Sequence, residues 1–274
     1  MTFDCFRRLI DECGPFLYTL DLFNWGEPLL NHSIFEMIQY AKRYRIRVVI
    51  SSNLHSCDAQ TCDRLVSSGL DVLIVSLHGA STTSVASYQE GAHMATVLQN
   101  IQLIHETKQR LHSSTPAVYW RYIVTKYNEE ELNVARLTSN ELGVDVMQFA
   151  PVRCHMGYEL LLTPTQQYAN VKDWLPLKES LSMYDYTTQA RKDIPKVCRW
   201  LWTRSVINWN GSVSPCCGVW HEHFDFGNIN NTTFFAVWNN QRYQEARRMF
   251  RVPNTTATPN LICQICRRNA AILA

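Results

Sequence analysis

Two apolar stretches of the sequence decide the fold, Ile46-Arg47-Val48-Val49-Ile50-Ser51-Ser52 and Asp71-Val72-Leu73-Ile74-Val75-Ser76-Leu77. Both are rich in the β-branched residues that strands favour. The residues between them, 58–68, have the pattern of a short helix that ends at Gly69. A strand, a helix and a second strand in this order predict a parallel βαβ unit. Because both strands are nearly continuous apolar runs, we expect both of their faces to be buried.

The same alternation extends in both directions from this unit. Further strands are predicted at 17–24, 116–124 and 144–150, and further helices at 2–13, 34–41, 94–110 and 129–142. Ser33-Ile34-Phe35-Glu36 has the pattern of a capping box at the start of the second helix. The order predicts an α/β fold with five parallel strands and crossover helices. The series opens on a helix with no strand before it, as in a βα repeat that lacks its first strand.

Composition excludes several classes of protein. Of the 274 residues, 46% are hydrophobic and 18% charged, which is not the composition of a disordered chain. The formal net charge of +2 gives no reason to expect a nucleic-acid or membrane partner. There is no apolar run long enough to span a bilayer, and the first residues do not resemble a secretory signal. We therefore expect a cytoplasmic protein.

Cysteine is the unusual component, with ten residues in the chain. Cys263 and Cys266 form a C-x2-C pair, a spacing that lets two thiolates meet at one metal. Cys198 and one of the adjacent residues Cys216 and Cys217, for which we expect Cys216, would complete a set of four thiolates. Such a set fits either zinc or an iron–sulfur cluster. The alternative is a group of buried free cysteines, since free cysteine is among the most buried residue types.

The remaining candidate ligands are less well spaced. We expect the thiols of five cysteines to be structural, namely Cys5, Cys13, Cys57, Cys62 and Cys154. His221-Glu222-His223 lacks the i, i+4 spacing of a helical metal site and is not expected to bind metal. Regular patterns weaken after the fifth strand, and cysteine and tryptophan then gather towards the end. The sequence thus predicts an α/β core at 1–155, a connector at 156–190 and a cysteine-rich module at 191–274.

Several motifs resemble those of radical S-adenosylmethionine (radical SAM) enzymes that carry a C-terminal SPASM domain. In the core, the similar segments are Asn24-Trp25-Gly26-Glu27-Pro28-Leu29-Leu30, Ser51-Ser52-Asn53-Leu54 and Val75-Ser76-Leu77-His78-Gly79-Ala80-Ser81. In the module, they are Asn210-Gly211-Ser212-Val213-Ser214-Pro215-Cys216-Cys217, Phe226-Gly227-Asn228-Ile229, Val237-Trp238-Asn239 and the pair Cys263 and Cys266. The resemblance implies a partial (βα)6 radical-SAM-type barrel lacking its first strand, followed by a SPASM module.

The family resemblance assigns roles to individual residues. It implies that Glu27, with the backbone at Gly26, holds the amino group of S-adenosylmethionine, because a carboxylate attracts an ammonium group. It also implies that Ser52, Asn53 and Ser76 line the same pocket and face the carboxylate and ribose of the cofactor. In the module, the resemblance implies an auxiliary [4Fe–4S] cluster.

The sequence departs from the family at three points. The C-x3-C-x2-C motif of the catalytic cluster is absent, since no three of the ten cysteines have that spacing. We therefore expect the family's first strand and cluster loop to be missing, and no reductive cleavage of S-adenosylmethionine by this polypeptide alone. His78 stands where the family usually has aspartate, and Gln89 stands where it has arginine. Both changes are expected to weaken cofactor binding.

Two functions are compatible with these motifs. The first is a fragment of an enzyme that performs radical chemistry on a peptide, a sugar or another small molecule, with a flavodoxin or ferredoxin as reductase. The second is a non-catalytic binding module with a structural cluster or a zinc site.

Overall fold

The computed structural model describes residues 1–154, 161–192, 198–218, 220–252 and 261–271. Residues 156–160 of the expected connector, and 193–197, 219, 253–260 and 272–274 of the expected module, lie outside this part of the chain. The contacts divide the chain into two compact units. One consists of Cys13–Val152 and Trp174–Leu181, and the other of Met1–Glu12, Arg153–Asp173 and Ser182–Ala274. The sequence boundaries at 155 and 190 stay a prediction.

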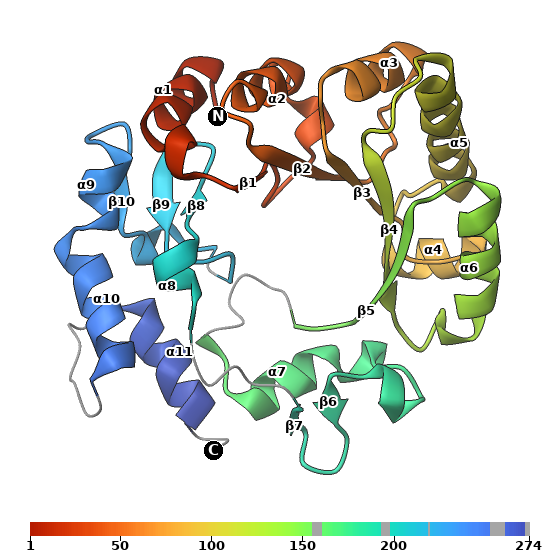
Figure 1. Ribbon diagram of the computed structural model, residues 1–274. Helices are drawn as coiled ribbons and strands as arrows, with labels where there is room; N and C mark the ends of the chain where they lie inside the picture. The colour runs from red at the N-terminus through yellow and green to blue at the C-terminus, as the bar shows by residue number, and fades with distance from the viewer. Residues whose placement is uncertain (155–160, 193–197, 219, 253–260, 272–274) are drawn as a thin grey trace. The chain divides into compact units, whose positions relative to one another are not determined.

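The first unit is built on one sheet of five parallel strands in the order β1-β2-β3-β4-β5. The strands are β1 (Thr19–Asp21), β2 (Arg47–Ser52), β3 (Val72–Ser76), β4 (Ala117–Val124) and β5 (Val146–Pro151). The crossover helices are α2 (Ile34–Lys42), α3 (Ala59–Ser67), α4 (Thr82–Tyr88), α5 (Met94–Arg110) and α6 (Leu132–Glu141), and α2, α3, α5 and α6 lie along the outer side of the sheet (Figure 1). The predicted α/β class and parallel order are confirmed.

The two faces of this sheet differ in burial. Side chains on the helix-covered face are almost fully buried, among them Val48, Ile50, Leu73, Val75 and Trp120. The opposite face carries an apolar cluster of Val49, Val72 and Ile74, against which Phe23, Ala117 and Tyr119 pack while only partly buried. The expectation of two buried faces is therefore confirmed for Val49, Val72 and Ile74 of β2 and β3, and this second face stays partly open only around them. We call it the open face.

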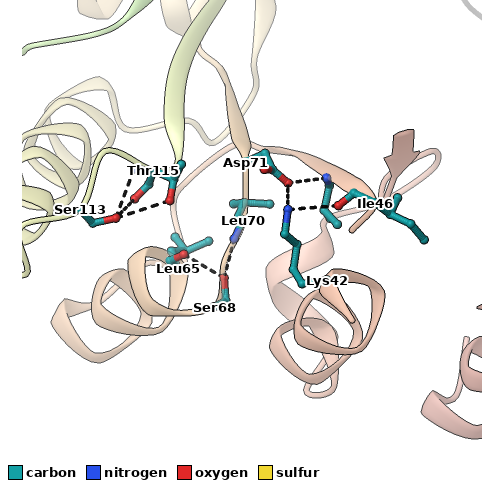
Figure 2. A network of polar contacts seen from close by, with 9 residues as sticks. Lys42, Ile46, Leu65, Ser68, Leu70, Asp71, Ser113 and Thr115 are labelled. Atoms are coloured by element: carbon teal, nitrogen blue, oxygen red, sulfur yellow. Dashed lines mark hydrogen bonds and ion pairs between the residues drawn. The ribbon is translucent and has the colours of Figure 1, made fainter. Parts of the chain in front are cut away.

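An ion pair joins a helix to the sheet at the amino ends of the strands (Figure 2). Asp71, which precedes β3, contacts the ammonium group of Lys42 from α2 at 2.6 Å. The same carboxylate oxygen accepts the backbone N–H of Val48 in β2 at 2.7 Å, and Lys42 also donates to the carbonyl of Ile46 at 3.1 Å. One carboxylate thus ties α2 to the start of β2 and β3.

The same arrangement recurs two strands later. Asp145, which precedes β5, accepts the backbone N–H of Val118 in β4 at 2.7 Å and contacts Lys108 of α5 at 3.2 Å. Each aspartate stands two residues after a glycine, and Gly69 and Gly143 have φ values of +83° and +67°. Such a backbone conformation favours glycine, because a side chain there is strained. The two Gly-x-Asp segments therefore have the same role. Each leads into a strand, β3 or β5, and its aspartate contacts the strand before it.

Three local features differ from the sequence predictions. Strand β1 covers only Thr19–Asp21 of the predicted 17–24, and helix α4 was not predicted. Ser33 precedes α2 but makes no side-chain cap, so the predicted capping box is wrong. Instead, the backbone N–H of Ser33 donates to the side-chain oxygen of Asn31 at 3.0 Å, because asparagine readily forms such a turn with the backbone two residues on.

The second unit contains the cysteine-rich module. Its helices are α1 (Phe3–Cys13, of which Cys13 falls in the other unit), α7 (Pro164–Val171), α8 (Trp200–Thr203), α9 (Phe234–Trp238), α10 (Gln241–Arg251) and α11 (Ile262–Ala271). Its strands β8 (Val206–Ile207), β9 (Ser212–Ser214) and β10 (Gly227–Asn228) form an antiparallel sheet, and β6 (Tyr184–Asp185) pairs with β7 (Ala190–Arg191). Among the described residues, no helix combines the length and the apolar character needed to cross a membrane.

Helix α1 is anchored within the second unit by a carboxylate. Glu12 accepts the backbone N–H groups of Phe234 and Phe235, at 2.9 and 2.8 Å, with its two oxygens. These are the first residues of α9, where N–H groups lack partners within the helix and where negative charge is stabilising. The first helix of the sequence is therefore bound to the cysteine-rich unit.

We predict that the substitution Asp71→Ala destabilises the fold by about 2–3 kcal/mol, because it leaves a partly buried ammonium group and a backbone N–H without their shared acceptor. Urea unfolding followed by circular dichroism measures the change. Asp63→Ala is the matched control, since the pair of Asp63 with Arg110 lies at the surface and should contribute only about 0–1 kcal/mol. Equal losses for the two variants would contradict the role of Asp71.

Candidate functional site

Polar side chains gather where the strands of the first unit end. Glu27 follows β1 and is half-buried. Its carboxylate accepts the backbone N–H of Leu29 at 3.0 Å and that of Asn53, just after β2, at 2.8 Å. Gly26 precedes it with a φ of +110°, a conformation that suits glycine. The carboxylate is therefore held in place by two backbone donors.

The serines at the ends of β2 and β3 point in different directions. The hydroxyl groups of Ser51 and Ser76 lie 3.2 Å apart, and both residues are half-buried. Ser52 is only 1% exposed, and its hydroxyl accepts the backbone N–H of Leu54 at 2.9 Å. Because side chains alternate along a strand, Ser51 lies on the open face and Ser52 on the covered face. Ser52 therefore does not line the open face. Its neighbour Ser51 lies there instead, in the position that was expected for Ser52.

The strand register extends this polar row across the sheet. Ser76 in β3 lies opposite Arg121 in β4, and Arg121 lies opposite Gln148 in β5. The guanidinium group of Arg121 donates to the side-chain oxygen of Gln148 at 3.1 Å. Neither residue was predicted from the sequence, although alternation along β4 and β5 could have indicated them. The row supplies one cation and several hydrogen-bonding groups beside the carboxylate of Glu27.

Asn53 lies at the surface, and its side-chain oxygen accepts the backbone N–H of His55 at 3.1 Å. It is joined to Glu27 through its own backbone N–H, so the structure brings the predicted residues Gly26, Glu27, Asn53 and Ser76 to the carboxyl ends of neighbouring strands. Ligands of open parallel sheets bind at these ends. The placement is suitable for a small-molecule cofactor.

His78 and Gln89 have structural hydrogen bonds. Gln89 accepts the backbone N–H of His78 at 2.8 Å and donates to the carbonyl of Ser76 at 3.0 Å, so its amide continues the hydrogen bonding beyond β3. The ring of His78 accepts the backbone N–H of Ile123 at 3.1 Å through Nδ1. Burial, aided by the charge of Arg121, lowers the pKa of His78 to about 4. The ring is therefore neutral at physiological pH.

The four expected ligand thiols come from three segments of the second unit. Cys198 lies just before α8, Cys216 just after β9, and Cys263 and Cys266 in the first turns of α11. Burial, together with the neighbouring thiols Cys217, Cys266 and Cys198, raises the pKa of Cys216 to about 12. Burial also raises the pKa of Cys263 well above its usual value, with contributions from Cys216, Cys266 and Cys198. Cys198 and Cys266 thus lie near enough to Cys216 and Cys263 to affect the ionisation of those two thiols.

The chemistry of this thiol group fits a metal or cluster. Buried thiols that disfavour each other's ionisation need a cation to become thiolates together. Within the described ranges, no group of three or more histidine, cysteine or acidic side chains is already arranged in metal-binding geometry. His221 and His223 are exposed, and their rings lie 6.5 Å apart in an edge-on contact. The donor set therefore fits by its chemistry, and its ligand geometry stays a prediction.

A family model of an iron–sulfur cluster-binding domain, SPASM, matches residues 198–267. This part of the chain therefore resembles a SPASM domain. The matched range begins at Cys198 and includes Cys216, Cys217, Cys263 and Cys266. No curated protein sequence matches the chain.

Solved structures with the same fold include radical SAM enzymes. Streptococcus suis SuiB bound to the precursor peptide SuiA is 15% identical and covers 92% of this chain, with a TM-score of 0.64. The S-adenosylmethionine complex of SuiB is 16% identical, covers 96% and has a TM-score of 0.64. The enzyme anSMEcpe with bound AdoMet is 14% identical, covers 98% of this chain and 87% of its own, with a TM-score of 0.60.

At these identities the likeness shows the fold, and the chain spans only 61% and 64% of SuiB in its two complexes.

The SPASM motifs of the sequence have clear structural roles. Gly211, with a φ of +80°, lets the β8–β9 turn pass Asn230, whose side chain would lie 2.7 Å from an added Cβ. The side chains of Asn228 and Asn230 donate to the carbonyl of Asn210, at 3.2 and 2.9 Å. Asn240 caps α10 and donates to the carbonyl of Phe226 at 2.7 Å. The motifs therefore shape the loops around the cysteines.

The buried, neutral His78 predicts a dependence of stability on pH. The unfolded chain takes up a proton near pH 6.5, whereas the folded chain takes it up only near pH 4. The contribution of His78 to the free energy of unfolding should therefore fall by about 3 kcal/mol as the pH drops through this window, and fall no further below it.

His78→Asn keeps an acceptor for the N–H of Ile123 and removes the titration. Urea unfolding between pH 7 and pH 4 should show a flatter curve for this variant than for the wild type. His112→Asn, at an exposed histidine, is the control and should keep the wild-type slope. Parallel curves for His78→Asn and the wild type would contradict the assignment.

Proposed function

We propose that this chain is part of a radical SAM enzyme acting on a peptide, and that its SPASM domain holds an auxiliary [4Fe–4S] cluster. The cluster ligands would be Cys198, Cys216, Cys263 and Cys266. The observation that carries the proposal is the match of residues 198–267 to an iron–sulfur cluster-binding domain. The effects of Cys198 and Cys266 on the pKa values of Cys216 and Cys263 support it.

Cys216 is favoured over Cys217 as the fourth ligand. The pKa of Cys263 is raised by Cys216, together with Cys266 and Cys198. The aromatic side chain of Tyr243, whose pKa burial raises to about 12, lies close enough to Cys216 and Cys263 to be affected by them. A bound cluster would supply electron transfer.

The open face of the first unit would bind S-adenosylmethionine. Glu27 would accept hydrogen bonds from the cofactor's ammonium group, with its carboxylate already oriented by the backbone of Leu29 and Asn53. Gly26, Asn53, Ser76 and Ser51 would line the remainder of the site.

A peptide substrate is supported by solved structures of the same fold that contain peptides, SuiB with SuiA and anSMEcpe with the Kp18Cys peptide. A flavodoxin or ferredoxin would act as reductase, and the reducing cytoplasm would suit the cluster.

A second function, a non-catalytic binding module with a structural cluster or zinc, has one observation in its favour. The side chains of His78 and Gln89 form hydrogen bonds with backbone groups in and next to β3 and β4, and neither side chain offers a charge to a cofactor. Four thiolates can also bind zinc. Iron, sulfide and zinc analysis of anaerobically purified protein distinguishes the two metals.

We predict that Cys263→Ala and Cys266→Ala each abolish cluster binding after anaerobic reconstitution, because three thiolates leave one iron without its ligand. Iron and sulfide per chain, together with the visible absorption of the cluster, measure the loss. Cys217→Ala is the matched control from the same module and should retain most of the cluster. The choice of Cys216 over Cys217 as the fourth ligand is wrong if Cys217→Ala loses the cluster and Cys216→Ala keeps it.

We predict that Glu27→Gln weakens binding of S-adenosylmethionine about tenfold, because it removes the charge from a hydrogen bond to the ammonium group. Equilibrium dialysis with labelled cofactor measures the affinity. Glu36→Gln, at an exposed glutamate of α2, is the control and should bind as the wild type does. Identical affinities for the two variants would remove Glu27 from the site.

A further inference from the structure

Two buried cysteines of the first unit lie in direct contact. The sulfur atoms of Cys57 and Cys62 are 3.2 Å apart, and the residues are 5% and 0% exposed. Cys57 belongs to the loop that leaves β2, and Cys62 lies in the first turns of α3. The spacing in the sequence gave no reason to pair them, and the proposed cluster does not use them.

The sulfur of Cys62 is held by a helix, whereas the sulfur of Cys57 belongs to a loop. Asp58 caps α3 by accepting the backbone N–H of Thr61 at 2.8 Å, and its carbonyl accepts the backbone N–H of Cys62 at 2.9 Å. Cys57 lies outside regular secondary structure. A disulfide needs a sulfur–sulfur distance of about 2.05 Å, so closure requires a shift of roughly 1 Å, which a loop can supply.

The pair has the acid–base character of a reactive dithiol. The contact between the two thiols lowers the pKa of Cys62, although burial and the carboxylates of Asp58 and Asp63 oppose this shift, whereas the same contact and burial raise the pKa of Cys57. The position of Cys62 near the amino end of a helix also favours a thiolate there. Cys62 is therefore the nucleophile, and Cys57 stays protonated as its partner.

We propose that Cys57 and Cys62 are a redox-active dithiol that a small hydroperoxide closes to a disulfide. The thiolate of Cys62 attacks the peroxide, which breaks the O–O bond and yields a sulfenic acid and hydroxide or alkoxide. The sulfur of Cys57 then attacks the sulfenic sulfur, loses its proton and displaces hydroxide, which leaves as water. The two sulfurs give up two electrons and the peroxide accepts them; a dithiol reductant reverses the reaction.

The loop that would be closed also carries part of the candidate cofactor site. Asn53, four residues before Cys57, donates its backbone N–H to Glu27. Leu54, between them, has a φ of +57°, and its carbonyl accepts from the buried side chain of Asn100 at 2.8 Å. A disulfide would join this loop covalently to α3. The dithiol itself depends on neither the cluster nor the proposed cofactor, so its test is independent of them.

The test is disulfide mapping in the full chain after treatment with hydrogen peroxide. Free thiols are blocked with N-ethylmaleimide under denaturing conditions, and the chain is cleaved on the amino side of aspartate. Cleavage before Asp58 separates Cys57, in the fragment 21–57, from Cys62, in the fragment 58–62. We expect these two fragments to be recovered as one disulfide-linked species, which dithiothreitol separates.

Cys5 is the matched control, because its buried thiol faces the side-chain oxygen of Asn230 at 3.6 Å and not a second sulfur. It should be recovered blocked by N-ethylmaleimide. Cys57→Ser and Cys62→Ser should each eliminate the linked species, while circular dichroism shows an unchanged fold. Hydrogen exchange of residues 53–62 in the wild type should slow about threefold or more on oxidation, because a cross-link restrains local opening.

Recovery of Cys57 and Cys62 as separately blocked fragments after peroxide treatment of folded protein would overturn the proposal. So would their irreversible oxidation to sulfinic or sulfonic acids without a link, or links between different chains.

Discussion

The alternation of side chains along parallel strands determines which residues can reach the candidate site. Ser51 and Ser52 are neighbours in the sequence, yet one lies on the open face and the other beneath the helices. The same alternation, carried across the register of β3, β4 and β5, aligns Ser76, Arg121 and Gln148 in one row. Because parallel strands end together, this row lies at the end of the sheet where Glu27 is held.

Stability and function are separated between the two ends of this sheet. At the amino ends, Asp71 and Asp145 each join a lysine of a helix to the backbone of the preceding strand. At the carboxyl ends, Glu27 and the polar row leave a partly open face. Substitutions at the amino ends should therefore be poorly tolerated, because each carboxylate has two partners. The carboxyl ends present polar groups that a ligand can use.

Periodicity predicted most of the fold, because helices and strands that bury one face show it in sequence. Helix α4 escaped prediction because it has little apolar pattern. Its start is stabilised by Glu131, which accepts from Ala80, Ser81 and Ser84 at 2.5 to 2.8 Å from about fifty residues away. A contact at that separation cannot be read from a local pattern. Strand β1 also depends on a partner distant in the sequence, since Thr19–Asp21 pairs with Arg47–Val49 of β2.

The candidate site was only partly predictable from the sequence. The motif around Glu27 and the cysteine spacing indicated two regions, and the match to residues 198–267 agrees with the second of them. Arg121 and Gln148 could not be assigned without the register, and Ser52 was chosen because a motif does not say which face a side chain takes. The contact of Cys57 with Cys62 lies where the loop after β2 meets the start of α3, which Asp58 caps.

The central claim is that four thiols of the SPASM domain hold an iron–sulfur cluster. X-ray absorption at the metal edges of anaerobically purified protein tests it most directly. The account predicts an iron edge with sulfur neighbours at about 2.3 Å and a second shell from neighbouring iron atoms. A zinc edge with four sulfur neighbours at about 2.3 Å and no metal neighbour would contradict it.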